Sequence, residues 1–143
     1  MKVIIMVVFM FSALTTSASG FADWLGGCGG KVNNFCQAKV VRVYDGDTFY
    51  INIHKVHSLF GKNLGVRIKG IDTPELRGGT PETKAAGIKA RDFAANKLKK
   101  AKRVDLKECT RGKFFRIVCF VYLDGKSLGK MLLKEKLAKV YDK

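Results

Sequence analysis

The sequence predicts an α+β fold that is mainly β: a five-stranded barrel of the OB type with two helices packed on it. Three observations predict it. Apolar and polar residues alternate in five short segments, as in strands with one buried face. Two longer segments carry apolar residues at helical spacing. The order is three strands, a helix, two strands and a helix, a series that buries its core most simply as a small closed or partly open barrel.

The first three strands are predicted in residues 37–71. A turn at Asp45-Gly46 separates the first strand, marked by Val41 and Val43, from the second. A third strand is expected over about residues 64–71, and consecutive strands should pair largely as antiparallel neighbours. The apolar face of the second strand consists of Phe49, Ile51 and Ile53.

The first helix is predicted over residues 83–100, with many lysines opposite its apolar face. Val104 and Leu106 open the fourth strand. The apolar face of this helix consists of Ile88, Phe93, Ala94 and Leu98. The apolar face of the fifth strand consists of Phe115, Ile117, Cys119 and Val121.

The second helix should close the domain after a turn at Asp124-Gly125. Ser127 can cap its first turn, and the helical spacing continues to about Ala138. Residues 36–143 would then form one domain, which is preceded by a glycine-rich tether at residues 19–35.

Residues 1–18 are predicted to be a secretory signal peptide. They hold one charge, Lys2, and an apolar run over residues 3–11, followed by small residues that place cleavage near Ala18 or Ser19. A membrane anchor is the main alternative, but the run is shorter than the ~20 residues that a spanning helix needs. A bacterial lipoprotein is a further alternative, because the sequence ending at Cys28 weakly resembles a lipoprotein signal. We expect a secreted or periplasmic monomer with no stable membrane association after cleavage.

The chain is strongly basic. Its 143 residues include 27 Lys plus Arg and 12 Asp plus Glu, for a formal net charge of +15. Removal of residues 1–18 takes away one lysine and no acid, so 26 basic residues would remain against 12 acidic ones. Such an excess favours nucleic acid or an anionic surface as the partner.

The cysteines predict disulfides, because disulfides persist in exported proteins. The chain has four of them, Cys28, Cys36, Cys109 and Cys119. Of the three possible connectivities we expect 28 with 36 and 109 with 119. A zinc site is the alternative, but no C-x-x-C occurs and neither His54 nor His57 lies near a cysteine in the sequence.

Two acidic motifs flank an arginine in the middle of the chain. Asp45-Gly46-Asp47-Thr48 precedes Arg67, and Ile71-Asp72-Thr73-Pro74-Glu75 follows it. Carboxylates bind divalent cations and a guanidinium binds phosphate, so the set suits metal-assisted phosphodiester cleavage. Taken singly, each part has an ordinary interpretation: a turn, a helix start and a solvated strand residue.

Taken together, these motifs resemble the staphylococcal nuclease (thermonuclease) family in order and spacing. The matching stretches are residues 43–48 and 66–75, Arg116 with residues 120–126, and residues 137–140. The resemblance extends over about residues 38–141 and implies an OB-type barrel that cleaves nucleic acid.

The resemblance implies a calcium site. Asp47, Asp72 and the backbone carbonyl of Thr73 would be the protein ligands, with water completing the coordination that Ca²⁺ prefers. Asp45 would not bind the ion directly but would help to position these ligands.

The resemblance also implies the catalytic groups. Glu75 would orient or deprotonate the attacking water, while Arg67 and Arg116 would hold the scissile phosphate. Lys113 matches a basic position that contacts the nucleotide. The family commonly has Tyr-Gly directly before the second arginine, where this chain has Phe114-Phe115, so the placement of Arg116 stays open.

We therefore expect a calcium-dependent nuclease that cuts DNA and RNA with low sequence specificity, at the 5′-oxygen, leaving 3′-phosphate ends. Single strands should be preferred, because Tyr50, Phe114 or Tyr141 could stack on unpaired bases. The alternatives are a non-catalytic OB-fold nucleic-acid-binding protein and a cationic exported protein that acts on anionic membranes or polymers.

Overall fold

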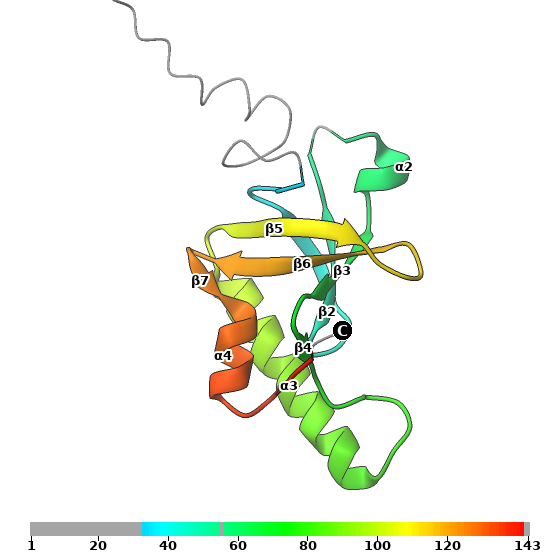
Figure 1. Ribbon diagram of the computed structural model, residues 1–143, viewed down its shortest axis with the longest axis vertical. Coiled ribbons are helices and arrows are strands. Elements are labelled where there is room, and N and C mark those ends of the chain that lie inside the picture. The colour runs from blue at the N-terminus through cyan, green and yellow to red at the C-terminus, as the bar shows by residue number, and fades with distance from the viewer. Residues whose placement is uncertain (1–32, 55, 142–143) are drawn as a thin grey trace, which may run out of the picture.

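The main sheet is curled into a partly open barrel (Figure 1). The computed structural model describes residues 33–54 and 56–141. The order across the sheet is β1 (Lys39–Val43), β2 (Thr48–Asn52), β3 (Leu64–Ile68), β6 (Arg116–Leu123) and β5 (Val104–Arg111), and β7 (Lys126–Ser127) pairs with β6. Consecutive strands pair antiparallel, as predicted, whereas β3 and β6 run parallel.

The segment before β1 joins the two ends of the sheet. Phe35 and Leu106 exchange backbone hydrogen bonds of 2.8 and 2.7 Å, and the amide of Ala38 donates to the carbonyl of Val104 at 2.9 Å. Since β1 and β5 are the outermost strands, these bonds bring the sheet edges together. The predicted OB-type α+β fold is confirmed.

Two long helices complete the core. Helix α3 (Pro81–Lys100) begins with the Thr80 side chain as its cap and proline in its first turn, and α4 (Leu128–Lys134) begins with Ser127 as its cap. The two helices contact each other beneath the sheet (Figure 1). A third, short helix, α2 (Ser58–Gly61), was not predicted. The most deeply buried core residues are Phe49, Ile51, Val66, Leu106, Cys119, Val121, Leu128 and Leu132.

Two predicted boundaries were wrong, and a strand near the end of the described residues was not predicted. Gly70, at φ +80°, divides the third predicted strand into β3 and a separate β4 (Ile71–Asp72). The closing helix ends at Lys134 instead of near Ala138. The chain then forms β8 (Lys139–Val140), which pairs antiparallel with β4, so the last described residues lie beside β4 (Figure 1).

Three predicted apolar faces were also wrong in part. A bulge between Val40 and Arg42 breaks the alternation of β1, so Val41 is 48% exposed while Val40 and Val43 pack on the core. Phe115 lies outside β6 in the hairpin, at φ +58°, and is 51% exposed. In α3, Ile88 is exposed and Ala90 takes the buried place beside Ala94 and Leu98.

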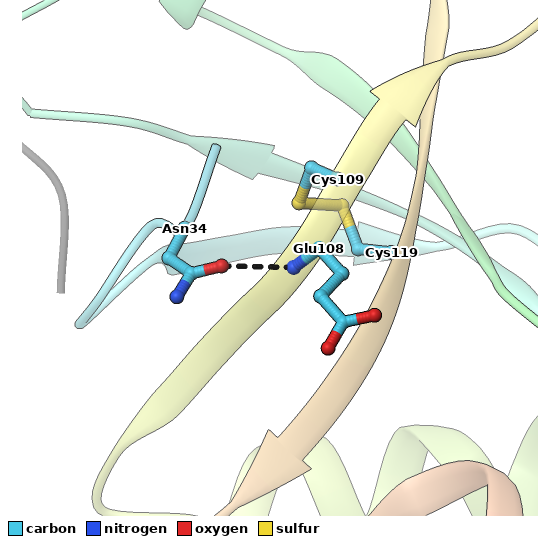
Figure 2. Close-up of a disulfide and its surroundings, with 4 residues drawn as sticks. All are labelled: Asn34, Glu108, Cys109 and Cys119. Carbon is cyan, nitrogen blue, oxygen red and sulfur yellow. Dashed lines mark hydrogen bonds between the residues drawn. A yellow bond between two sulfur atoms is a disulfide. The ribbon is translucent and has the colours of Figure 1, made fainter. Parts of the chain in front are cut away.

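One predicted disulfide is present, between Cys109 on β5 and Cys119 on β6 (Figure 2). Beside it, β5 bulges at Glu108, whose amide donates to the Asn34 side-chain oxygen at 2.8 Å (Figure 2). Cys36 is also disulfide-bonded. Cys28, the partner expected for it, lies outside the described residues, as do the predicted signal peptide and most of the predicted tether.

No helix in the described ranges is long and apolar enough to cross a membrane. Likewise, no group of three or more His, Cys, Asp or Glu side chains in residues 33–54 and 56–141 could hold a metal ion. Because Cys109 and Cys119 are bonded to each other, neither is available as a zinc ligand.

We predict that the double substitution Cys109→Ala/Cys119→Ala lowers the free energy of unfolding by about 2–3 kcal/mol, since the bond closes a short loop. Urea denaturation of the variant and the wild-type protein measures the difference. Equal free energies of unfolding would show that the bond does not stabilise the fold.

Candidate active site

One guanidinium joins two carboxylates at the end of the barrel. Arg67 Nη1 donates to Asp47 Oδ1 at 3.0 Å, and Arg67 Nη2 donates to Asp72 Oδ1 at 2.5 Å. The β2–β3 register pairs Thr48 with Arg67, which places Asp47 beside the arginine. The structure thus brings together three predicted site residues from separate parts of the chain.

Asp47 is the buried member of this group, with 2% of its surface exposed. Its Oδ1 also accepts a hydrogen bond from Thr48 Oγ1 at 2.9 Å, and its Oδ2 accepts one from the Thr73 amide at 3.1 Å. An ionised carboxylate has about four acceptor positions, so one stays available. Burial, the largest single influence, lowers the pKa of Arg67, but the charges of Asp47 and Asp72 raise it overall above its ordinary value.

Gly46 allows the acidic turn to lie directly against α3. A Cβ atom at this position would lie 2.7 Å from Ala90 Cβ and 2.9 Å from Thr73 Cγ2, closer than real side chains pack. Asp45 in the same turn accepts a hydrogen bond from the Asp47 amide at 3.1 Å. Burial, and then the negative charge of Asp47, raise the pKa of the Asp45 carboxyl to about 6.

Asp72 lies on β4, and its side chain is 53% exposed. It is held in place through β8, because Asp72 pairs with Lys139 and the Tyr141 amide donates to the Gly70 carbonyl at 3.1 Å. The Glu75 side chain is exposed in the loop before α3. Among the described residues it makes no hydrogen bond or ion pair, so nothing in the structure ties it to Arg67 or the aspartates.

Arg116 begins β6 and lies across Gly65 of β3. A Cβ atom on Gly65 would lie 2.7 Å from Arg116 Cγ, so glycine makes room for the arginine stem. Arg116 lines a pocket of about 350 Å³ together with Arg67, Lys113 and Tyr141, which we call the Tyr141 pocket. Arg116 Nε donates to the Lys113 carbonyl at 3.5 Å, and its guanidinium carbon lies 5.5 Å from the Phe114 ring centroid, so the hairpin groups are the partners of Arg116 in this structure.

Lys69 is a pocket residue that the sequence analysis did not identify. It lies two positions after Arg67 and lines the same pocket. The alternation of side chains along a strand could have revealed it, since every second residue points to the same face. Phe114 does not line this pocket but lines a neighbouring one, beside Tyr50.

The donors present fit calcium in their chemistry. Two aspartates and the carbonyl of Thr73 are the hard oxygen ligands that Ca²⁺ accepts, and its coordination can be completed by water. In this structure Arg67 bonds both carboxylates, so an ion held by them would share these oxygens with the guanidinium.

The chain belongs to the staphylococcal nuclease family. The sequence profile described as staphylococcal nuclease homologue matches residues 65–143, which confirms the resemblance seen in the motifs. A thermonuclease from Staphylococcus hyicus is 32% identical over 102 residues, covering 71% of this chain and 54% of that protein. An uncharacterized protein from Methanocaldococcus jannaschii is 29% identical over 126 residues, covering 72% of this chain and 58% of that protein.

The chain thus spans little more than half the length of these curated relatives. Family membership and the thermonuclease relative support a nuclease.

The raised pKa of Asp45 predicts a pH-dependent effect of Asp45→Asn. Folding favours the protonated form of the Asp45 carboxyl. Protonation of this group therefore stabilises the fold fully below pH 3.8, the ordinary pKa, and the stabilisation is lost as the pH rises through about 6, the pKa in the folded protein. Without metal, asparagine should therefore raise the free energy of unfolding by about 2 kcal/mol above about pH 7. Urea denaturation in chelator at several pH values tests this. If Asp45→Asn raises the free energy of unfolding by the same amount near pH 3.8, the packing of the asparagine, and not the removal of a charge, is responsible.

Proposed function

We propose that this chain is a secreted or periplasmic calcium-dependent nuclease that hydrolyses phosphodiester bonds in DNA and RNA. It cuts at the 5′-oxygen, leaves 3′-phosphate ends and acts as a monomer. The observation that supports it most is that Arg67 binds both Asp47 and Asp72 while lining one pocket with Arg116. Two arginines therefore line a space that a phosphodiester could enter, and one of them also binds both aspartates.

Each group has a part in this proposal. Arg67 and Arg116 donate hydrogen bonds to oxygens of the scissile phosphate and offset the charge that grows on them as water adds. A bound Ca²⁺ supplies further positive charge beside the same phosphate. Glu75 accepts a proton from the attacking water, after its loop brings the exposed carboxylate toward the phosphate.

Low sequence specificity follows from these contacts, because the phosphate backbone carries no sequence information. The strongly basic composition favours any nucleic acid over neutral polymers. Unpaired strands are the preferred substrate, since exposed aromatic side chains surround the pockets.

Calcium removal and Asp72→Asn test the metal assignment. Asp72 is half exposed, so this substitution should leave the fold intact while removing a charged ligand oxygen, and turnover should fall about a hundredfold. Degradation of single-stranded DNA and RNA is measured in calcium and in chelator, with Asp92→Asn on the exposed face of α3 as the matched control. Asp47→Asn is the poorer test, because the Asp47 carboxylate accepts three hydrogen bonds and its loss would also destabilise the fold.

Equal turnover of Asp72→Asn and wild type in calcium would contradict the metal assignment. Binding of nucleic acid without cleavage under every condition would favour the alternative of a non-catalytic OB-fold binding protein.

Arg116→Lys tests the second arginine. Lysine keeps the charge but loses the planar pair of donors, so kcat should fall on the order of a hundredfold with little change in KM. Arg67→Lys should cause a similar loss. Arg91→Lys, at an exposed arginine of α3 paired with Asp92, is the control and should have no effect. An active Arg116→Lys variant beside an inactive Arg67→Lys variant would leave this protein with one catalytic arginine.

A further inference from the structure

A second pocket, of about 510 Å³, lies beside the first and is walled by aromatic rings. Tyr44, Tyr50, Phe114 and Phe115 line it together with Arg116, and we call it the aromatic pocket. Its volume is in the range of pockets that bind small organic molecules. Among the described residues, Arg116 is the one that lines both this pocket and the Tyr141 pocket.

The aromatic pocket also reaches the acidic group. Thr48 lines it, and the Thr48 hydroxyl donates to Asp47 Oδ1 at 2.9 Å. Because Arg116 lines both pockets, a phosphate held by its guanidinium would lie where the two pockets meet. A strand that crosses this phosphate has to place the neighbouring nucleotides in or over these two pockets.

The two phenylalanines are held in an unfavourable state. Phe114 is 85% exposed, and Phe114 and Phe115 have φ values of +56° and +58°, a region that costs side-chain-bearing residues about 1 kcal/mol or more each. Phe115 is fixed by Phe60, at a ring-centroid distance of 6.5 Å, and by the Arg111 guanidinium, 4.3 Å from its ring centroid. Such strain and exposure at two neighbouring rings point to side chains that are kept available for a ligand.

The charges around the rings are positive. The Arg42 guanidinium lies 3.7 Å from the Tyr50 ring centroid, and that of Arg116 lies 5.5 Å from the Phe114 centroid. No acidic residue is among the described residues that line the pocket. Aromatic faces with cations beside them suit an unpaired nucleotide, whose base stacks while its phosphate meets the cation.

We infer that the aromatic pocket binds the base of the nucleotide on the opposite side of the scissile phosphate from the Tyr141 pocket, an inference that rests on the proposed function. The strand is then held by a base on each side of the bond to be cut. Both bases must be unstacked from their neighbours and unpaired to enter the pockets. This requirement, and not the arginine contacts, makes the substrate single-stranded.

The test uses a thymidine dinucleotide, which has a single phosphodiester, and its two counterparts that lack one base or the other. In the wild-type protein, removal of the base that enters the aromatic pocket should lower kcat/KM about tenfold. Phe114→Leu should cause a similar loss with the complete dinucleotide, and the substitution should not endanger the fold because the ring is so exposed.

The decisive comparison is whether the two losses add. When the substrate lacks the base on the aromatic-pocket side, Phe114→Leu should cause no further loss of kcat/KM. When the substrate lacks the other base, Phe114→Leu should lower kcat/KM as much as it does with the complete dinucleotide. Tyr122→Leu is the control, at a ring on β6 outside both pockets with Lys107 Nζ 4.8 Å from its centroid, and should leave all three rates unchanged. Full additivity with both counterparts, or a silent Phe114→Leu, would overturn the inference.

Absence of cleavage of every nucleic acid would instead refute the proposed function. Binding constants of the same three dinucleotides for wild type and Phe114→Leu then give the same comparison without cleavage. If removal of the base on the aromatic-pocket side weakens binding equally in the wild-type protein and in Phe114→Leu, the assignment of that base to the aromatic pocket is wrong.

Discussion

The paired contact of Arg67 with Asp47 and Asp72 is the constraint on which the rest of the site depends. Asp47 is buried, and a buried carboxylate is costly without a partner of opposite charge. Each neighbouring feature keeps that pairing in place: Gly46 lets the acidic turn lie on α3, and β8 holds the strand that carries Asp72. The parallel pairing of β3 with β6 adds Arg116 to the same group.

The charges of this group explain how it could accept a phosphate. Two aspartates and one guanidinium leave an excess of negative charge, which would repel a phosphodiester and attract a cation. A bound divalent ion reverses the sign, and Arg116 strengthens the reversal. In the proposed nuclease, metal and substrate would thereby be linked electrostatically: the ion would offset the acids, while Lys69, Lys113 and Arg116 add positive charge for the anion.

Much of the architecture could be predicted from the sequence, because alternation reports strands that have one buried face. Prediction from this alternation failed where the backbone departs from regular geometry, at the bulge beside Val41 and at the positive φ of Phe115. Neither irregularity changes the apolar pattern of the sequence. The closing helix was predicted too long because apolar residues beyond Lys134 continue the spacing after the helix has ended. The motifs led to Asp47, Arg67 and Asp72, whereas the position of Arg116 required knowledge of Gly65. The exposure of Glu75 had no signal in the sequence.

The pairing of β4 with β8 sets the order in which the molecule can be completed. Asp72 is synthesised well before Lys139, its partner across the small sheet. Until residues 139–141 have been made, the strand that carries Asp72 lacks its partner in the small sheet, and the contact with Arg67 is what positions its side chain. The acidic pair is therefore completed late in translation, after the barrel strands that carry Arg67 and Arg116.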